Sequence, residues 1–148
     1  MSMQETVFDS TVAPEVALPP VQKRPVVLLV EDDAAVRRYL EVILRRAGYE
    51  VIQATNGLEA IKIAVSTKVD AVVTDAVMPH LNGHELCRYL RARPELSRLP
   101  LLLLTGLEPA ATAAASPETS RHADAHLTKP VRPEDFTACL ARLLAANN

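Results

Sequence analysis

Four separate places in the chain carry side chains suited to phosphate chemistry. Acids occupy positions 31–33, and Asp75, Thr105 and Lys129 lie further along. Carboxylate oxygens are the ligands that Mg²⁺ prefers, and water and phosphate oxygens usually complete its shell. A lysine ammonium and a threonine hydroxyl can each bind a phosphoryl oxygen. Because an aspartate carboxylate can itself accept a phosphoryl group, these residue types indicate metal-assisted phosphoryl transfer.

Three of these places directly follow a short run of apolar or β-branched residues, and Lys129 follows the run Ala125–Thr128, which is apolar or β-branched apart from His126. Such runs are typical of strands in a parallel sheet that is covered on both faces. Glu31, Asp75, Thr105 and Lys129 each occupy the first position after one of them. The predicted strands are Val26–Val30, Glu50–Ala54, Ala71–Thr74, Leu101–Leu104 and Ala125–Thr128.

Helical periodicity fills most of the connections between these strands. Apolar residues recur every three or four positions after the first, second, third and fifth strands. Gly48 is expected to end the first helix, and Pro133 to begin the last. Alternating strands and helices predict right-handed crossovers and a doubly wound, five-stranded parallel α/β sheet. Ligands of such sheets bind beyond the carboxyl ends of the strands, so the four polar places should meet at one edge.

The connection after the fourth strand departs from this pattern. Residues 110–115 are alanines with one threonine, so a helix there could bury little beyond methyl groups. Pro117 would interrupt such a helix, whereas Pro109 could begin it. Propensity alone rarely holds a short helix in water. We therefore expect a short or irregular fourth helix.

Composition is that of one globular domain preceded by an arm. The chain has 148 residues, of which 49% are hydrophobic and 23% charged. Residues 1–25 include four prolines and show no lasting periodicity, so we expect a flexible arm there and a single domain over 26–148. The arm also contains several apolar residues, so a second interpretation, in which the arm docks on a partner protein, stays open.

Charge and composition exclude several classes of function. Lys and Arg number 16 against 18 Asp and Glu, which gives a net charge of −2 and no basic surface for nucleic acid or anionic membrane. The apolar runs are too short to cross a bilayer, and the N-terminal residues do not have the basic and apolar regions expected of a signal peptide. Cys87 and Cys139 form no CxxC pair, so neither a disulfide framework nor a zinc site is expected. We expect a cytoplasmic protein.

Taken together, four motifs resemble those of response-regulator receiver domains. The resemblance extends over roughly residues 25–146 and implies a flavodoxin-like (βα)5 fold with strand order 2-1-3-4-5. Any one of the motifs would be weak evidence, whereas the whole set is specific. The motifs are Val30-Glu31-Asp32-Asp33, Asp75 with Met78-Pro79 and Gly83, Leu103-Leu104-Thr105-Gly106, and Lys129-Pro130.

The resemblance implies roles for the acidic residues. Asp75 corresponds to the family's phosphoacceptor. Asp32 corresponds to a direct ligand of Mg²⁺, and Glu31 to a partner that usually acts through water. The backbone carbonyl of Val77 would complete the protein's share of the metal shell.

Further roles fall on the last two strands. Thr105 corresponds to the hydroxyl that follows the phosphoryl group on activation, and Lys129 to the lysine that binds it. The peptide bond to Pro130 is cis in the family. His126 stands where the family has its switch residue, which is often aromatic.

The resemblance implies a single-domain response regulator of a two-component system or phosphorelay. Its phosphoryl donor would be a sensor histidine kinase or a histidine phosphotransfer protein. Because the sequence ends at Asn148, directly after the last helix, we expect output through binding of a separate protein. The domain would assist only its own phosphorylation and dephosphorylation, and so would not be an enzyme. The kinase, the output partner and the oligomeric state are not predicted.

Two alternatives stay open at this point. One is a receiver-like module that binds partners without phosphorylation. The other is a phosphotransferase of the haloacid-dehalogenase type, which needs a second aspartate two residues after the nucleophile, where this chain has Val77. Val77 and Leu107 would also flank the path of an attacking water in a receiver, so a long-lived phosphoryl group is expected.

Some nearby residues have simpler interpretations. Asp33 is expected to cap the following helix. His80, His84 and His122 are expected to be surface residues and not metal ligands. No nucleotide-binding glycine motif follows the first strand, so Gly83 is expected to belong to a helix-entry turn.

Overall fold

The computed structural model describes residues 23–106 and 122–147. Most of the predicted N-terminal arm lies outside these ranges. The predicted fourth helix, which would fall between Glu108 and Pro117, lies outside them as well.

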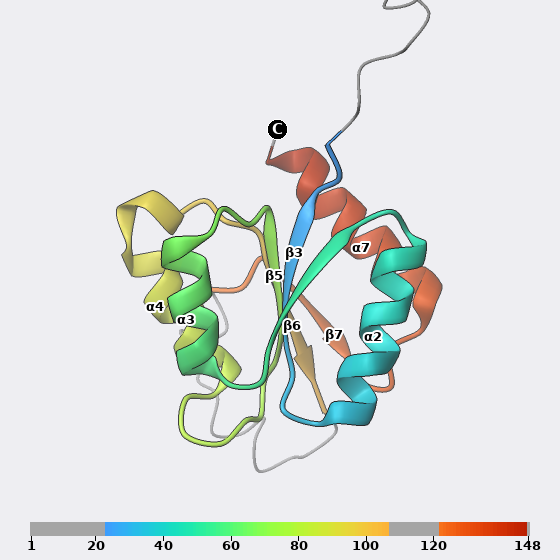
Figure 1. The fold of residues 1–148 in the computed structure, drawn as a ribbon, viewed down its shortest axis with the longest axis horizontal. Coiled ribbons are helices and arrows are strands. Elements are labelled where there is room, and N and C mark those ends of the chain that lie inside the picture. The colour runs from blue at the N-terminus through green and yellow to red at the C-terminus, as the bar shows by residue number, and fades with distance from the viewer. Residues whose placement is uncertain (1–22, 107–121, 148) are drawn as a thin grey trace, which may run out of the picture.

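Within the described ranges, five parallel strands form one sheet in the order β4-β3-β5-β6-β7 (Figure 1). Numbered along the chain, this order is 2-1-3-4-5, which confirms the predicted doubly wound, flavodoxin-like fold. The strands are β3 (Val26–Val30), β4 (Glu50–Ala54), β5 (Ala71–Asp75), β6 (Leu101–Thr105) and β7 (Ala125–Thr128).

Two strands are one residue longer than their apolar runs predict. Asp75 pairs with Leu104 in register, and Thr105 pairs with Thr128. The backbone ladder continues past the last apolar side chain, because side-chain polarity reflects the surroundings and not the backbone pairing. Asp75 and Thr105 are therefore the last residues of β5 and β6, and the backbone pairing of the sheet holds both in place.

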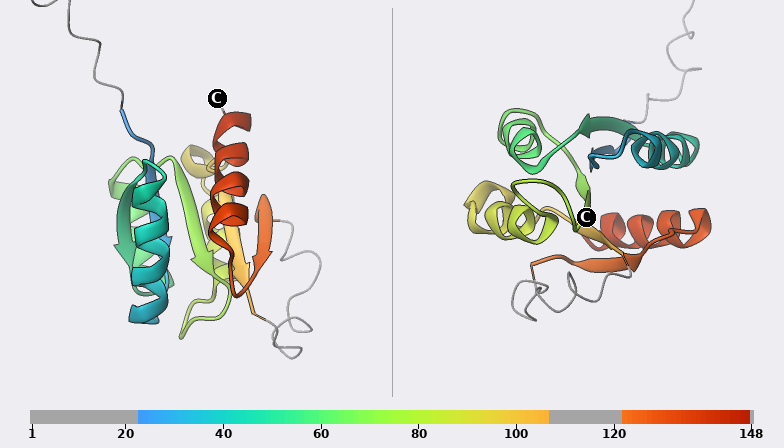
Figure 2. Two further views of the ribbon diagram at one scale, coloured as in Figure 1. Left: turned by 90° about the vertical axis from the view of Figure 1, so that its right-hand side faces the viewer. Right: turned by 90° about the horizontal axis from the view of Figure 1, so that it is seen from below.

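Helices cover both faces of the sheet. In the views of Figures 1 and 2, α3 and α4 lie against one face, and α2 and α7 against the other. Each expected boundary residue holds its place, since Gly48 follows the first helix with a φ of +99° and Pro133 begins the last. The helices are α2 (Ala34–Arg46), α3 (Gly57–Ser66), α4 (Gly83–Ala92), the 3₁₀ turn η1 (Pro94–Leu96) and α7 (Pro133–Ala146).

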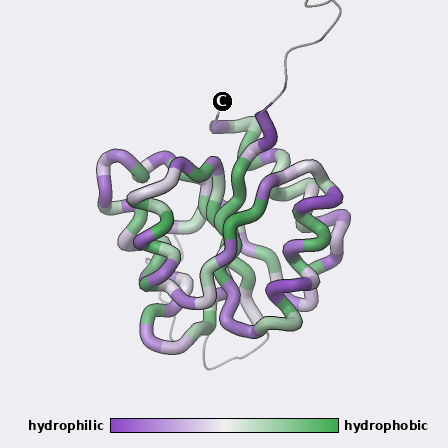
Figure 3. Tube along the Cα trace, in the orientation of Figure 1, coloured by the Kyte–Doolittle hydropathy of each residue, from purple (hydrophilic) through white to green (hydrophobic). Residues whose placement is uncertain are grey.

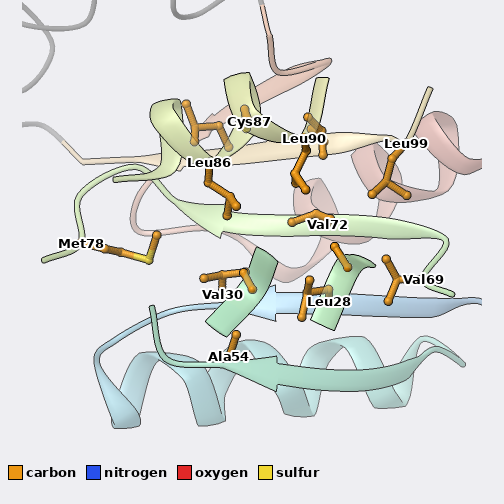
Figure 4. Packing of buried hydrophobic residues seen from close by; sticks show 14 of the residues in the cluster. Leu28, Val30, Ala54, Val69, Val72, Met78, Leu86, Cys87, Leu90 and Leu99 are labelled. Atoms are coloured by element: carbon orange, nitrogen blue, oxygen red, sulfur yellow. The ribbon is translucent and has the colours of Figure 1, made fainter. Parts of the chain in front are cut away.

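Each face of the sheet has its own apolar core. Alternate residues of β3 point to opposite sides: Leu28 and Val30 pack in the α3–α4 core shown in Figure 4, and Val27 and Leu29 in the α2–α7 core. All four are fully buried. In Figure 3, the most hydrophobic parts of the chain follow the strands, in agreement with these two cores. Because β3 is packed on both faces, the backbone that leads into Glu31, the next residue, is held firmly in place.

Capped helices begin directly after the loops that carry the acids. Asp33 caps α2 as expected, because its Oδ1 accepts from the N–H groups of Ala35 at 2.9 Å and Val36 at 3.0 Å. Asn82 and Glu85 bond reciprocally at the start of α4, each accepting from the other's backbone N–H. These caps limit the freedom of both loops.

Arg91 of α4 holds the chain that leads into β7. Its guanidinium donates to the carbonyl of His122 at 2.8 and 3.1 Å and pairs with Asp124 at 2.9 Å. It also donates to the carbonyls of Ser97 and Leu99. One side chain therefore fixes the start of β7, the strand that carries His126 and leads to Lys129.

Among the described residues, no helix is both long and apolar enough to cross a membrane.

Candidate functional site

Three carboxylates converge at the carboxyl edge of the sheet, at the lower end of β3 in Figure 1. β3 and β5 are neighbours in the sheet, so Glu31 and Asp32 after β3 meet Asp75 at the end of β5. One carboxylate oxygen from each residue lies within 4.8 Å of the others. Glu31 and Asp75 are buried, whereas Asp32 is exposed, so the cluster opens to solvent on the side of Asp32.

Lys129 lies between two of these acids. Its Nζ is 3.1 Å from Oε1 of Glu31 and 3.0 Å from Oδ2 of Asp75. The following peptide bond, to Pro130, is cis. One ammonium thus serves two carboxylates, and its position beside Asp75 allows it to bind an oxygen of a group carried there.

Burial changes the proton affinities in this cluster. It raises the pKa of Glu31 to about 7, and the charge of Asp75 adds to the rise, while the Asp33 N–H and the Lys129 ammonium oppose it. For Lys129, burial favours the neutral form, but the hydrogen bond and charge of Asp75, together with Glu31, raise its pKa overall. The Lys129 ammonium alone therefore does not keep Glu31 fully ionised near neutral pH, and a second cation beside the carboxylate would be needed.

The donor set fits Mg²⁺. It consists of oxygens from three carboxylates on two adjacent strand ends, the arrangement a hard cation prefers. When all three ionise, the single Lys129 ammonium leaves two negative charges, which a divalent cation would balance. The backbone of Val77 lies at the same loop, where its N–H faces Oδ1 of Asp75 at 3.5 Å. Glu31, Asp32 and Asp75 are thus the residues that would hold the metal, whereas the role of the Val77 carbonyl stays a prediction.

Thr105 and His126 lie one and two strands away from Asp75. Thr105 ends β6, and its hydroxyl donates to the carbonyl of Leu127 at 3.4 Å. His126 pairs with Leu103 in the ladder and is exposed, although the partial desolvation of its imidazole lowers its pKa. Thr105 therefore lies at the carboxyl edge of the sheet and His126 two residues short of the end of β7, and among the described residues neither forms a hydrogen bond to Asp75.

His84 differs from the surface position expected of it. It is half-buried at the start of α4, and within the described chain its Nδ1 is buried with no hydrogen-bond partner. Burial lowers its pKa, and the nearby charge of His126 lowers it further. In the part of the chain that is described, only the cluster of Glu31, Asp32 and Asp75 has the spacing of a metal site, so His84 is not assigned to one.

Gly83 begins α4, in agreement with the helix-entry turn expected of it, but two contacts at the site were not predicted from the sequence. Gly83 packs against the backbone of Asp75, and a Cβ there would clash with the Asp75 carbonyl and meet Cδ1 of Leu103 at 2.7 Å. Arg37 donates from Nη1 to the carbonyl of Glu31 at 2.8 Å. The sequence offers no signal for this contact, because the neighbouring Arg38 has nearly the same spacing from the acids and turns to Glu41 instead.

The pKa of Glu31 predicts a pH dependence of stability. Because the pKa is about 7 in the folded protein and 4.5 ordinarily, the folded state holds the proton more tightly. The stabilisation from this proton is complete below pH 4.5 and is lost as the pH rises through 7. In EDTA, we expect urea unfolding to show stability falling from pH 5 to pH 8, relative to Glu31→Gln. If the free energies of unfolding of the two proteins change with pH in parallel, the raised pKa is wrongly assigned to Glu31.

Metal binding should also stabilise the fold. Mg²⁺ would bind only the folded cluster and relieve the repulsion between Glu31 and Asp75. At ten times its dissociation constant, it would add about 1.4 kcal/mol, or a few degrees in Tm. Thermal melts across millimolar Mg²⁺ should show this rise, and it should shrink in Asp32→Asn. An unchanged Tm would argue against a metal site.

Comparison with known proteins gives a consistent result. A profile of the response regulator receiver domain matches residues 27–141. The response regulator MprA of Mycobacterium sp. strain KMS is 38% identical over 118 residues, which cover 80% of this chain and 50% of MprA. This chain thus spans about half the length of the curated relatives it matches.

Solved structures agree with this match. The signal receiver domain of a histidine kinase from Syntrophus aciditrophicus has 31% identity and a TM-score of 0.72, covering 82% of this chain and 91% of that domain. The receiver domain of the sensor histidine kinase PA1611 from Pseudomonas aeruginosa PAO1 has 27% identity and a TM-score of 0.72, covering 83% and 99%, and holds a magnesium ion in its active-site cleft.

The profile match covers more than half of the chain, and the fold, the strand order and the acidic cluster agree with it. Receiver domains are signalling modules of two-component systems in which phosphorylation and Mg²⁺ are general, and they are not enzymes of the usual kind. This chain belongs to the response regulator receiver domain family.

Proposed function

We propose that this chain accepts a phosphoryl group on Asp75, with Mg²⁺ held by Glu31, Asp32 and the Val77 carbonyl. The observation that carries the proposal is the position of Lys129, whose ammonium lies 3.0 Å from Asp75 within the acidic cluster. A buried carboxylate beside a fixed cation and a metal-binding oxygen set is suited to receive a phosphoryl group.

In this reaction, a carboxylate oxygen of Asp75 attacks the phosphorus of a phosphohistidine. The bond from phosphorus to the donor's histidine nitrogen breaks as the new oxygen–phosphorus bond forms, which gives an acyl phosphate. Lys129 binds one phosphoryl oxygen as Asp75 loses its own negative charge. Mg²⁺, when bound, neutralises charge on the transferring group.

After transfer, Thr105 can bind another phosphoryl oxygen. Its hydroxyl would exchange the 3.4 Å bond to the Leu127 carbonyl, which is weak by length, for a stronger bond to a charged oxygen. The exchange would alter the β6–β7 edge near His126 and so connect the chemistry of Asp75 to a surface. This is the switch role that the family resemblance implies for Thr105 and His126.

The proposed donor is a sensor histidine kinase or a histidine phosphotransfer protein. An open, mainly apolar pocket lies beside the site and can receive part of such a partner. It is formed by Val36, Tyr39 and Leu40 of α2 and by the chain from Lys129 to Val131. Output is proposed to be a contact with a separate protein in the cytoplasm, since a net charge of −2 offers little to nucleic acid.

The test is incubation with acetyl phosphate and Mg²⁺, followed by intact mass and by assay of released phosphate. We expect the protein to gain one phosphoryl group, and the gain to require Mg²⁺. No gain would favour the phosphorylation-independent binding module. Steady release of phosphate from varied phosphoesters would favour the phosphotransferase, although Val77 stands where that mechanism needs an aspartate.

The lifetime of the phosphoryl group should depend on Val77. Its side chain is 50% exposed and follows Asp75 by two residues, so an apolar group faces the approach of water. We expect Val77→Asn to speed the loss of phosphate from Asp75, because an amide can bind and orient that water. The decay is followed by intact mass after removal of acetyl phosphate, and an unchanged rate would count against this role. Leu107, the other residue expected to act here, lies outside the described residues.

A further inference from the structure

Arg37 ties the acidic loop to the edge strand of the sheet. The loop in question joins β3 to α2 and consists of Glu31, Asp32 and Asp33. From α2, the Arg37 guanidinium donates through Nη1 to the backbone carbonyl of Glu31 at 2.8 Å and through Nε to Oε1 of Gln53, on β4, at 3.1 Å. One side chain thus connects the loop to β4.

The carbonyl that Arg37 holds belongs to the peptide unit between Glu31 and Asp32. A peptide unit is planar, so fixing its oxygen also fixes the direction in which the chain enters Asp32. On the other side of Glu31, its N–H donates to the carbonyl of Ala54, again on β4, at 3.1 Å. The backbone between the two acids is therefore anchored to β4 at both ends of Glu31.

The position of the Asp32 carboxylate depends on this anchoring more than that of the Glu31 carboxylate does. The Glu31 carboxylate has its own partners, the Asp33 N–H at 3.1 Å and Lys129 at 3.1 Å. Among the hydrogen bonds of the described residues, none involves the Asp32 carboxylate, and the residue is exposed. Only the backbone that leads into Asp32 can aim its carboxylate at the space shared with Glu31 and Asp75.

We propose that Arg37 is a positioning residue of the metal site. It holds the Glu31–Asp32 peptide so that both carboxylates meet Asp75 in the geometry that a divalent cation needs, and it touches neither the cation nor the phosphoryl group. The proposal rests on the proposed function, since it concerns the same metal site. Residues that orient ligands from outside the ligand shell commonly change metal affinity by about ten- to a hundredfold.

The positive charge of Arg37 weakens Mg²⁺ binding, whereas its positioning of the acids would strengthen it. The direction in which the Mg²⁺ affinity changes when Arg37 is replaced therefore distinguishes the two effects. A guanidinium near a cation site repels Mg²⁺, so its removal would tighten binding if charge were its main contribution. If it positions the acids, its removal weakens binding despite the lost repulsion. The guanidinium lies at a half-exposed position, where water screens its charge, so we expect positioning to dominate.

The experiment is isothermal titration of Mg²⁺ into unphosphorylated protein. Arg37→Leu should raise the dissociation constant about tenfold. Arg38→Leu is the matched control, because it removes the same charge from the next residue of α2, a side chain that is 76% exposed and pairs with Glu41 at 3.4 Å. Its dissociation constant should stay within about twofold of wild type. Gln53→Leu, which removes only the second anchor of Arg37, should raise the dissociation constant by less than Arg37→Leu.

Thermal melts in EDTA serve to establish that the variants are folded. Equal or tighter Mg²⁺ binding by folded Arg37→Leu would overturn the positioning role, as would equal losses in Arg37→Leu and Arg38→Leu. Should Arg37→Leu fail to fold, Gln53→Leu decides, and a dissociation constant equal to that of wild type overturns the proposal. Absence of Mg²⁺ binding by the wild-type protein would instead refute the proposed function and this inference with it.

Discussion

Asparagine in place of Asp75 is expected to abolish phosphoryl uptake and to stabilise the metal-free protein. The amide lacks the anionic oxygen that attacks phosphorus, so intact mass after acetyl phosphate and Mg²⁺ should stay unchanged. Stability should rise because Glu31 and Asp75 share one ammonium, and a neutral residue 75 leaves Lys129 to pair with Glu31 at 3.1 Å. Melts in EDTA should therefore show a higher Tm than wild type.

Asp33→Asn is the matched control for this variant. It removes a carboxylate from the same acidic run, yet asparagine caps helices as well as aspartate does, so α2 keeps its start. Asp33→Asn should take up phosphate as wild type does. Uptake that survives in Asp75→Asn, or is lost in Asp33→Asn, would contradict the assignment of the acceptor.

Methionine in place of Lys129 is expected to destabilise the metal-free protein strongly. It keeps most of the apolar stem of the side chain but leaves the buried Glu31 and Asp75 carboxylates facing each other without a cation. Removing one partner of a buried ion pair costs about 3 kcal/mol or more. Urea unfolding in EDTA at pH 8 should show this loss. The loss should be smaller at pH 5, where Glu31, with its pKa of about 7, is protonated.

Two comparisons isolate the cause of this loss. Lys62→Met changes an exposed lysine of α3 and should move stability by no more than about 0.5 kcal/mol. The double variant Lys129→Met with Asp75→Asn should recover most of the loss, since only one carboxylate then lacks a partner. Saturating Mg²⁺ should recover part of it in the single variant. If Lys129→Met in EDTA is as stable as wild type, the ammonium does not hold the two acids together.

The sequence was sufficient to predict the sheet and the residues at its edge. Buried parallel strands such as Val26–Val30 and Leu101–Leu104 are apolar throughout, and their period differs from that of the helices, so the alternation is visible in the sequence except in the connection after Leu104. The edge rule for doubly wound sheets then predicts that Glu31, Asp75 and Lys129 lie together. The observed strand order and the distances around Lys129 agree with that expectation.

Contacts that depend on the direction of a side chain could not be predicted in this way. Helix α2 carries several arginines, and nothing in their spacing distinguishes Arg37, which turns back to Glu31, from Arg38, which turns to Glu41. The close approach of Gly83 to the Asp75 backbone depends on how α4 packs on the sheet. The half-buried setting of His84 depends on the same packing, and periodicity does not report it.

The most direct test of the account is to locate the phosphoryl group in the wild-type chain. After incubation with acetyl phosphate and Mg²⁺, borohydride reduces an aspartyl phosphate to homoserine, and tandem mass spectrometry of the peptides identifies the converted residue. The account predicts conversion at Asp75 alone, and none when EDTA replaces Mg²⁺. Conversion at Asp32 or Asp33, or a phosphoryl group found on a histidine, would contradict it.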